Sequence, residues 1–310
     1  MRVFSLALVF CAISSAQDTT ATVEGRVLDP PGRVITGAVV RATNTSTGYT
    51  QSQITSSSGG SHLSLPAATY DILVEAPDFA RLTQKDVQLN VSQTARIDFS
   101  LTIVRDKEVV AVTGDVPTVQ TSSNEIGNVV TGRELIDLPL NGRNFTQLGL
   151  LQPGVAPLTA GLAAAGGSLR AGQAYSVDGQ RPESNNYLLD GVTNVNRVDG
   201  GYALRTPVDA IQEFRTLTET APAEYGGTSG ATTVVTRSGG NALHGSLYEF
   251  LRNDTLDARN FFASAVEPLK QNQFGAALGG PLRKNRDFFF GYYVESGPPR
   301  LVQFGLKLVF

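Results

Sequence analysis

The sequence predicts a mainly β protein, and three observations lead to that prediction. Short apolar runs alternate with turn clusters along most of the 310 residues. Glycine and proline are frequent (32 and 15 residues) and tryptophan is absent, which favours many short strands over long helices. The final segment, 301–310, alternates apolar and polar residues with the period of a strand that has one apolar face. We therefore expect strands from near the start of the chain to its last residue.

Residues 1–16 are predicted to be a secretory signal peptide. Arg2 precedes an apolar stretch at 3–13, and the small residue Ala16 favours cleavage directly after it. Lipoprotein cleavage before Cys11 is the alternative. After cleavage at Ala16 the mature chain holds no cysteine and forms no disulfide. No apolar run is long enough to cross a bilayer as a helix, so a membrane role would have to use strands.

The charge balance and the histidine count exclude several classes of function. The formal net charge is -3 and there is no long basic run, so we expect no nucleic-acid partner. His62 and His244 belong to no cluster with ligand spacing, so we expect no metal. The glycine-rich stretch at 161–172 lacks the lysine of a phosphate loop. We therefore expect no catalytic residues and no cofactor.

Residues 17–103 are predicted to form a small β-sandwich. Val23 and Val27 alternate with Glu24 and Arg26, which is the pattern of a half-buried antiparallel strand, and similar runs follow. The succession VEGRVLDPPGRVITGAVVRATNTSTG, LPAATYDILVEAPDF and VQLNVSQTARIDFSLTI resembles the carboxypeptidase regulatory-like domain. That resemblance implies a transthyretin/Ig-like sandwich of the carbohydrate-binding-like fold, with a glycan as one candidate ligand.

Residues 104–240 are predicted to form a small α+β domain. Thr131 as an N-cap, with Glu134 three residues later, predicts a short helix, and a second short helix follows. Two short strands are expected around turn dipeptides at Asp178, Gly179, Asp190 and Gly191. This segment resembles the plug domain of TonB-dependent outer-membrane transporters.

The stretch VDAIQEFRTLTETAPAEYGGTSGATTVVTRSGGN, residues 208–241, carries most of that resemblance. It is similar to the closing motif of the plug, and the motif residues present here are Glu213, Arg215, Tyr225 and Gly226. Together with Glu224, the first two could form an ionic latch to a barrel wall. On a plain surface they would be solvated charges of little energetic weight.

The stretch EVVAVTGD lies between the predicted sandwich and the predicted plug. Its extended β-branched run suits pairing with an added strand, and an ordinary linker strand would suit the run nearly as well. The resemblance to the transporters implies that a segment here couples to the periplasmic energy-coupling protein TonB. The residues of this candidate segment are Glu108, Val109, Val110, Ala111 and Val112.

Residues 241–310 are predicted to be antiparallel strands of an outer-membrane β-barrel, because apolar and polar residues alternate in segments of suitable length. The side chains expected to face outward are Tyr248, Phe250, Phe274, Ala276, Leu278, Phe288, Phe290, Tyr292 and Val294. The last segment resembles the closing strand that the barrel-assembly machinery recognises, with Phe304, Leu306, Leu308 and Phe310 on its apolar face. About four strands cannot close a barrel, since even small ones have about eight. The middle of the barrel is therefore expected to be missing, with a join near VESGPPR.

These segments together resemble the Oar-like branch of TonB-dependent outer-membrane receptors, which carries the same N-terminal sandwich. The resemblance implies a non-enzymatic receptor or transporter, in fragmentary or internally deleted form, for an unidentified extracellular ligand. It also implies export to the bacterial outer membrane, with TonB and the barrel-assembly machinery as partners. The alternative is a soluble periplasmic or secreted module that binds a carbohydrate or another partner without transport.

Overall fold

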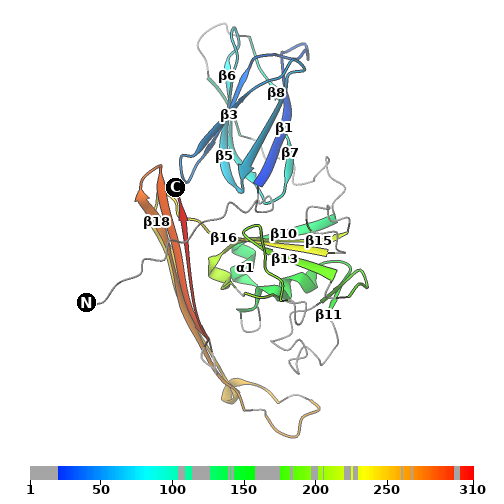
Figure 1. Ribbon diagram of the computed structural model, residues 1–310, viewed down its shortest axis with the longest axis vertical. Helices are drawn as coiled ribbons and strands as arrows, with labels where there is room; N and C mark the ends of the chain where they lie inside the picture. Colours follow the sequence, from blue (N-terminus) through cyan, green and yellow to red (C-terminus); the bar gives the residue numbers. More distant parts are fainter. Residues whose placement is uncertain are drawn as a thin grey trace, which may run out of the picture.

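The computed structural model describes residues 20–103, 109–113, 126–138, 140, 143–157, 175–181, 184–196, 202–204, 206–219, 225, 230–259, 261–266, 268–296 and 301–310. These residues form a β-sandwich, a small α+β domain that we call the plug, and a four-stranded sheet that we call the wall (Figure 1). Within these ranges no helix combines the length and the apolar character needed to span a membrane. The predicted signal peptide lies outside the described residues.

The sandwich consists of two sheets. One has the order β4-β1-β7, with β8 also paired to β1, and the other has the order β3-β2-β5-β6-β9. The strands are β1 (Thr20–Leu28), β2 (Val39–Asn44), β3 (Thr50–Ile54), β4 (Gly60–Pro66), β5 (Ala68–Glu75), β6 (Arg81–Leu89), β7 (Thr94–Arg96), β8 (Phe99–Ser100) and β9 (Val109–Thr113). The last of these pairs in parallel with β6, so the second sheet continues beyond residue 103.

The core of the sandwich comes from alternate residues of its strands. On β5, Ile72 and Val74 are fully buried while Asp71 and Leu73 are only half-buried, which is the period-two pattern expected from the sequence. Side chains from both sheets join them in one apolar cluster, including Val23 and other β1 residues. Burial of these alternating side chains therefore holds the two sheets together.

The plug contains a mixed sheet of order β10-β15-β16-β13-β14 and a separate hairpin of β11 and β12. Its elements are β10 (Ile126–Thr131), α1 (Gly132–Asp137), the 3-10 helix η2 (Phe145–Leu151), β11 (Val155–Pro157), β12 (Tyr175–Val177), β13 (Asn185–Leu189), β14 (Val192–Thr193), the 3-10 turn η4 (Val208–Ala210), β15 (Ile211–Glu219) and β16 (Gly230–Thr236). The first helix begins after Thr131 as predicted, but the Thr131 side chain makes no capping hydrogen bond. The second helical segment is capped instead by Asn144, which accepts from the backbone N–H of Thr146 at 3.2 Å.

Aromatic side chains fill the centre of the plug. The rings of Tyr187 and Tyr202 lie 4.0 Å apart, and Phe145 meets Phe214 edge-on at 5.9 Å. The Tyr175 hydroxyl lies 3.0 Å from the hydroxyl of Thr232, so this buried polar group has a partner. A plug with so little helix therefore obtains its core mainly from rings on short strands and loops.

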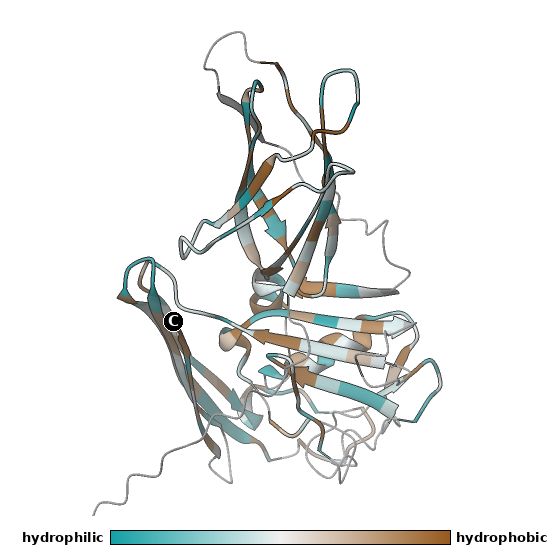
Figure 2. Cartoon of the chain, turned by 45° about the horizontal axis from the view of Figure 1, so that its top comes forward, coloured by the Kyte–Doolittle hydropathy of each residue, from teal (hydrophilic) through white to brown (hydrophobic). Residues whose placement is uncertain are grey.

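The wall is an antiparallel meander of order β17-β18-β19-β20 that runs along one side of the plug as a long curved band (Figure 1). Its elements are β17 (His244–Asn253), the 3-10 turn η6 (Asp254–Leu256), β18 (Lys270–Arg283), β19 (Asp287–Ser296) and β20 (Leu301–Val309). The short turn at 284–286 lies at the end nearest the sandwich, where Asn241 bonds both Asn285 and the Ser46 carbonyl. Figure 2 shows hydrophobic and hydrophilic residues alternating along strands of the chain.

The predicted outward faces are correct on two wall strands. On β18, Phe274, Ala276 and Leu278 alternate with Ala277, which packs against Ala210 of the plug. On β20 the apolar residues alternate with Lys307, which contacts the plug. These two strands therefore turn their apolar residues away from the plug.

The predicted faces are wrong on β17 and β19. Tyr248 and Phe250 lie against a plug arginine, and Phe290 and Tyr292 join the cluster around Ala210. Phe288 and Val294 share that side by strand alternation and are buried. Apolar residues occupy both alternating positions on these strands, with leucines opposite the rings on β17 and aromatic residues on both sides of β19, so contact with the plug decides the face and the apolar pattern does not.

Truncation of a buried sandwich residue tests the packing. We expect Ile72→Ala to lower the free energy of unfolding of the sandwich by about 2–5 kcal/mol, because it leaves a cavity at a site with no exposed surface. Ser52→Ala, at an exposed position on β3, should change it by less than about 0.5 kcal/mol. Native-state hydrogen exchange of the sandwich amides measures both values, and similar effects of the two substitutions would contradict this core.

Candidate functional site

The plug holds the sandwich with two buried charged side chains of β15. The Glu213 carboxylate accepts a hydrogen bond from the Val91 backbone N–H at 2.8 Å. Arg215 Nη1 donates to the carbonyl oxygens of Val91 at 3.0 Å and Ser92 at 2.6 Å. Both charged side chains are at most 4% exposed. They are therefore not solvated surface charges. Both bind the sandwich turn at residues 90–93, which we call the latch turn, so the interpretation as a latch to the barrel wall is wrong for these two residues. Glu224 lies outside the described residues.

Two further hydrogen bonds strengthen the same interface. The Tyr225 hydroxyl donates to Ser92 Oγ at 2.7 Å, and Gln212 Nε2 donates to the Ala67 carbonyl at 2.9 Å. The latch turn has a defined shape of its own, because Ser92 has a φ of 53° and the Gln93 side chain accepts from a backbone N–H within the turn. A shaped turn thus meets two donors, Arg215 and Tyr225, and one acceptor, Glu213, on the plug.

Burial changes the acid–base behaviour of this interface. Desolvation raises the pKa of Glu213 to about 7, while the hydrogen bond from Val91 and the charge of Arg215 act in the opposite direction. The carboxyl is 3% exposed, so desolvation outweighs the two favourable contacts. The interface between plug and sandwich therefore contains a group that exchanges its proton near neutral pH.

Arg143 connects the plug to the wall. Its Nη2 donates to Asp209 Oδ2 at 2.7 Å, and its guanidinium lies 5.0 Å from the ring centroid of Tyr248 and 4.4 Å from that of Phe250. The ion pair is 13% and 9% exposed, which favours strong contacts with the aromatic rings. Arg143 of the plug therefore contacts the rings of two wall residues and holds them on the side of the wall that faces the plug.

The turn at Asp190 makes a second connection between plug and wall. Lys307 Nζ on β20 lies 3.3 Å from Asp190 Oδ1 and donates to the carbonyl and the hydroxyl of Thr236, each at 3.2 Å. The Asp190 carboxylate also accepts from the Thr236 backbone N–H and hydroxyl. Asp190 and Gly191 both have positive φ, as a two-residue hairpin turn requires, so this dipeptide shapes the turn and binds the wall.

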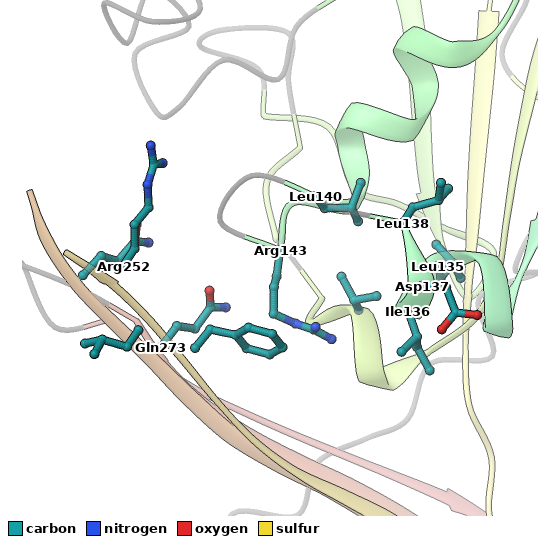
Figure 3. A pocket seen from close by; sticks show the side chains of 12 residues that line it. Leu135, Ile136, Asp137, Leu138, Leu140, Arg143, Arg252 and Gln273 are labelled. Carbon is teal, nitrogen blue, oxygen red and sulfur yellow. The ribbon is translucent and has the colours of Figure 1, made fainter. Parts of the chain in front are cut away.

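A cavity of about 530 Å³ separates α1 from the first two wall strands (Figure 3). Its plug side is apolar except for Asp137 and Arg143, and Leu135, Leu138 and Leu140 lie across from Gln273 and Arg252 of the wall. Arg143 lies between the two sides. The combination of apolar side chains, two amides, two arginines and an aspartate suits a partly apolar ligand with polar groups.

The remaining predicted plug and coupling residues are placed as follows. Asp178 and Gly179 form the turn after β12, with φ values of 50° and 73°. Val109, Val110, Ala111 and Val112 lie in β9 at the edge of the sandwich. Glu108 and Gly226 lie outside the described residues.

On the wall, Phe304, Leu306, Leu308 and Phe310 are exposed on the side away from the plug. The two histidines are separate from each other. His62 lies 3.2 Å from Glu24 on the sandwich surface, and the His244 ring stacks at 6.2 Å on Phe290.

Sequence analysis did not identify Arg143, Asp209 or Lys307. No local motif marks the first two, because their significance comes from elements more than sixty residues apart in the chain. Lys307 did carry a signal, since it is a single charge on the polar side of an otherwise apolar strand.

The buried carboxyl predicts a specific pH dependence. A folded-state pKa of about 7, raised from 4.5, means that the folded protein holds this proton more tightly than the unfolded chain does. The stabilising contribution is therefore complete below about pH 4.5 and is lost as the pH rises to about 7. We expect Glu213→Gln, which keeps an acceptor for Val91, to remove this dependence from the melting temperature measured between pH 5 and 8. Glu134→Gln, at an exposed carboxyl, is the matched control, and a wild-type profile parallel to that of Glu213→Gln would contradict the assignment.

Truncating one partner of the Arg143–Asp209 ion pair, which lies within the plug beside the wall, should cost more than replacing both. We expect Arg143→Met to destabilise the plug by about 3–5 kcal/mol, because Asp209 is left as a buried charge without this partner. Arg143→Met combined with Asp209→Asn should recover part of that loss. A double-mutant cycle on urea unfolding measures the coupling, and strictly additive effects would show that the pair is not coupled.

Comparison with known protein families gives two matches. Residues 22–102 match the carboxypeptidase regulatory-like domain. Residues 235–296, which cover most of the wall, match an outer membrane beta barrel domain. The first match confirms the predicted identity of the sandwich, and the second confirms the predicted barrel character of the strands after the plug.

Among individual proteins, the TonB-dependent transporter Oar of Myxococcus xanthus is 27% identical over 303 residues. The match covers 91% of this chain and 27% of Oar, so the chain spans about a quarter of that relative. The siderophore receptor PirA of Acinetobacter baumannii is 23% identical over 55% of the chain and 24% of PirA, with a TM-score of 0.43. Catechol 1,2-dioxygenase from Acinetobacter sp. ADP1 is 15% identical over 33% of the chain and 60% of that structure, with a TM-score of 0.25. The chain is therefore similar to the TonB-dependent transporter Oar over most of its own length, and it combines a match to the carboxypeptidase regulatory-like domain with a later match to an outer membrane beta barrel domain.

Proposed function

We propose that this chain forms the plug and part of the wall of a TonB-dependent receptor that takes up an extracellular ligand through the bacterial outer membrane. One observation carries the proposal. The wall binds the plug on one face and exposes apolar side chains on the other, including Leu247 at 86%, Phe304 at 74% and Leu306 at 72%. Soluble proteins rarely expose a continuous apolar face of this kind, whereas lipid would cover it.

The dimensions and orientation of the wall fit that proposal. Its strands have 9 to 14 residues, and a tilted strand needs about 9–11 residues to cross a bilayer. The short turn at 284–286 lies beside the sandwich, and the 3-10 turn η6, which follows β17 in the longer connection to β18, lies at the opposite end (Figure 1). Outer-membrane barrels have short periplasmic turns and longer outer loops, so the sandwich would lie in the periplasm.

The edges of the wall indicate what else the proposed receptor needs. Within the described residues, β17 and β20 each pair with one wall strand only. An open sheet edge in lipid leaves backbone groups unpaired at several kcal/mol each. We therefore propose that further barrel strands flank the wall in the functional receptor, as in a relative of which the matched part is only 27%.

The partners follow from the same proposal. The candidate coupling residues in β9 would pair with a TonB-type periplasmic protein by strand addition. The closing strand with Phe310 would be the segment that the barrel-assembly machinery recognises. The ligand remains to be identified, with the cavity behind α1 as a candidate site and a glycan as a candidate ligand of the sandwich.

Membrane fractionation tests the proposed location. We expect the chain, expressed with its own leader, to stay in the outer-membrane pellet after a carbonate wash and to be extracted only by detergent. Leu306→Glu should shift it towards the soluble fraction, because it places a charge on the lipid side, where arginine or lysine costs up to about 2–4 kcal/mol and glutamate somewhat less. Ser52→Glu, on an exposed strand of the sandwich, should have no such effect. A freely soluble periplasmic product would instead favour the binding module without transport.

A further inference from the structure

The sandwich contributes a strand-binding surface at the edge that β9 forms. Residues 109–113 pair with residues 81–85 of β6 in five consecutive parallel positions. The order of that sheet ends at β9, so within the described residues no strand pairs with its other edge. The sandwich sheet thus ends in an edge that can accept one more strand.

Backbone geometry divides the groups of β9 between its two sides. In a parallel ladder, successive residues direct their N–H and C=O groups to opposite edges of a strand. About half of the β9 backbone groups therefore bond to β6, and the other half point to the open edge. Adding a strand at the open edge uses only the second half and leaves the bonds to β6 intact.

The strand that holds β9 is itself anchored to the plug. Its far end, at Leu89, leads directly into the latch turn at residues 90–93. That turn bonds Glu213 and Arg215 of β15. Leu82 of β6 belongs to the buried core of the sandwich, so β6 is held along its length as well as at its end.

From this arrangement we propose that β9 binds its periplasmic partner while it remains the edge strand of the sandwich. The partner is one extended strand of a second protein, which lengthens the sheet from β3-β2-β5-β6-β9 to six strands. The sandwich is then part of the coupling complex, because β6 pairs with β9, which binds the partner strand, and its far end leads into the latch turn. This inference rests on the proposed function, which assigns the coupling segment to β9.

A reversible disulfide between β6 and β9 tests the proposal. Thr83 and Ala111 are register partners, and neighbouring strands place their Cα atoms within the range that a disulfide spans. The full chain in detergent would carry Cys11→Ser together with Thr83→Cys and Ala111→Cys. The probe is the purified C-terminal periplasmic domain of a TonB-type protein from the source bacterium. A matched control carries Arg41→Cys and Ser52→Cys, which are register partners at the opposite edge of the same sheet.

We expect the oxidised and reduced forms of the β6–β9 variant to bind the probe with dissociation constants within about twofold of each other. Hydrogen exchange should show added protection in β9 and unchanged protection in residues 81–85 of β6. A loss of binding of about tenfold or more on oxidation, absent from the control, would overturn the proposal, since β9 would then have to leave β6. Failure of the unmodified chain to bind the probe would instead refute the proposed coupling function.

Discussion

Burial of charge in one short stretch of the plug, residues 209–215, determines how the three parts of the chain are arranged. Asp209 fixes the arginine that covers two aromatic rings of the wall, and Ala210 packs under the wall. Glu213 and Arg215 then bind the latch turn of the sandwich. Because these contacts come from one turn and the strand that follows it, the plug fixes the wall and the sandwich relative to each other.

Buried charges contribute more to the specificity of this arrangement than to its stability. Removing a carboxylate and a guanidinium from water costs free energy that their mutual attraction only partly returns. An apolar interface of similar size could hold the sandwich as firmly, but it would tolerate sliding, because apolar contacts are not directional. Arg215 has to meet two particular carbonyl oxygens of the latch turn, so only one position of the sandwich satisfies it.

Much of the fold could be predicted from sequence, because strand alternation and turn dipeptides are local signals. The buried positions of Ile72 and Val74 and the turn at Asp190 follow directly from neighbouring residues. The faces of β17 and β19 could not be predicted, since apolar residues stand at both alternating positions of each strand. Distant plug residues select the face, Arg143 for β17 and Ala210 for β19. The partner of Glu213 was also missed because it is distant in the chain. The sequence identifies Glu213 only as a charged residue, and its burial depends on the sandwich turn more than a hundred residues earlier.

The wall is built to be covered by a plug. In an open channel the inner face of a barrel is polar and wet. Here the inner face carries Phe288, Phe290 and Val294, all at most 8% exposed, and polar contacts such as that of Lys307 lie between them. Withdrawal of the whole plug would expose these rings to water, at a cost that grows with the apolar area uncovered. In the proposed receptor, a conformational change that opens a path would therefore be cheaper if it rearranged part of the plug and left residues 209–215 against the wall.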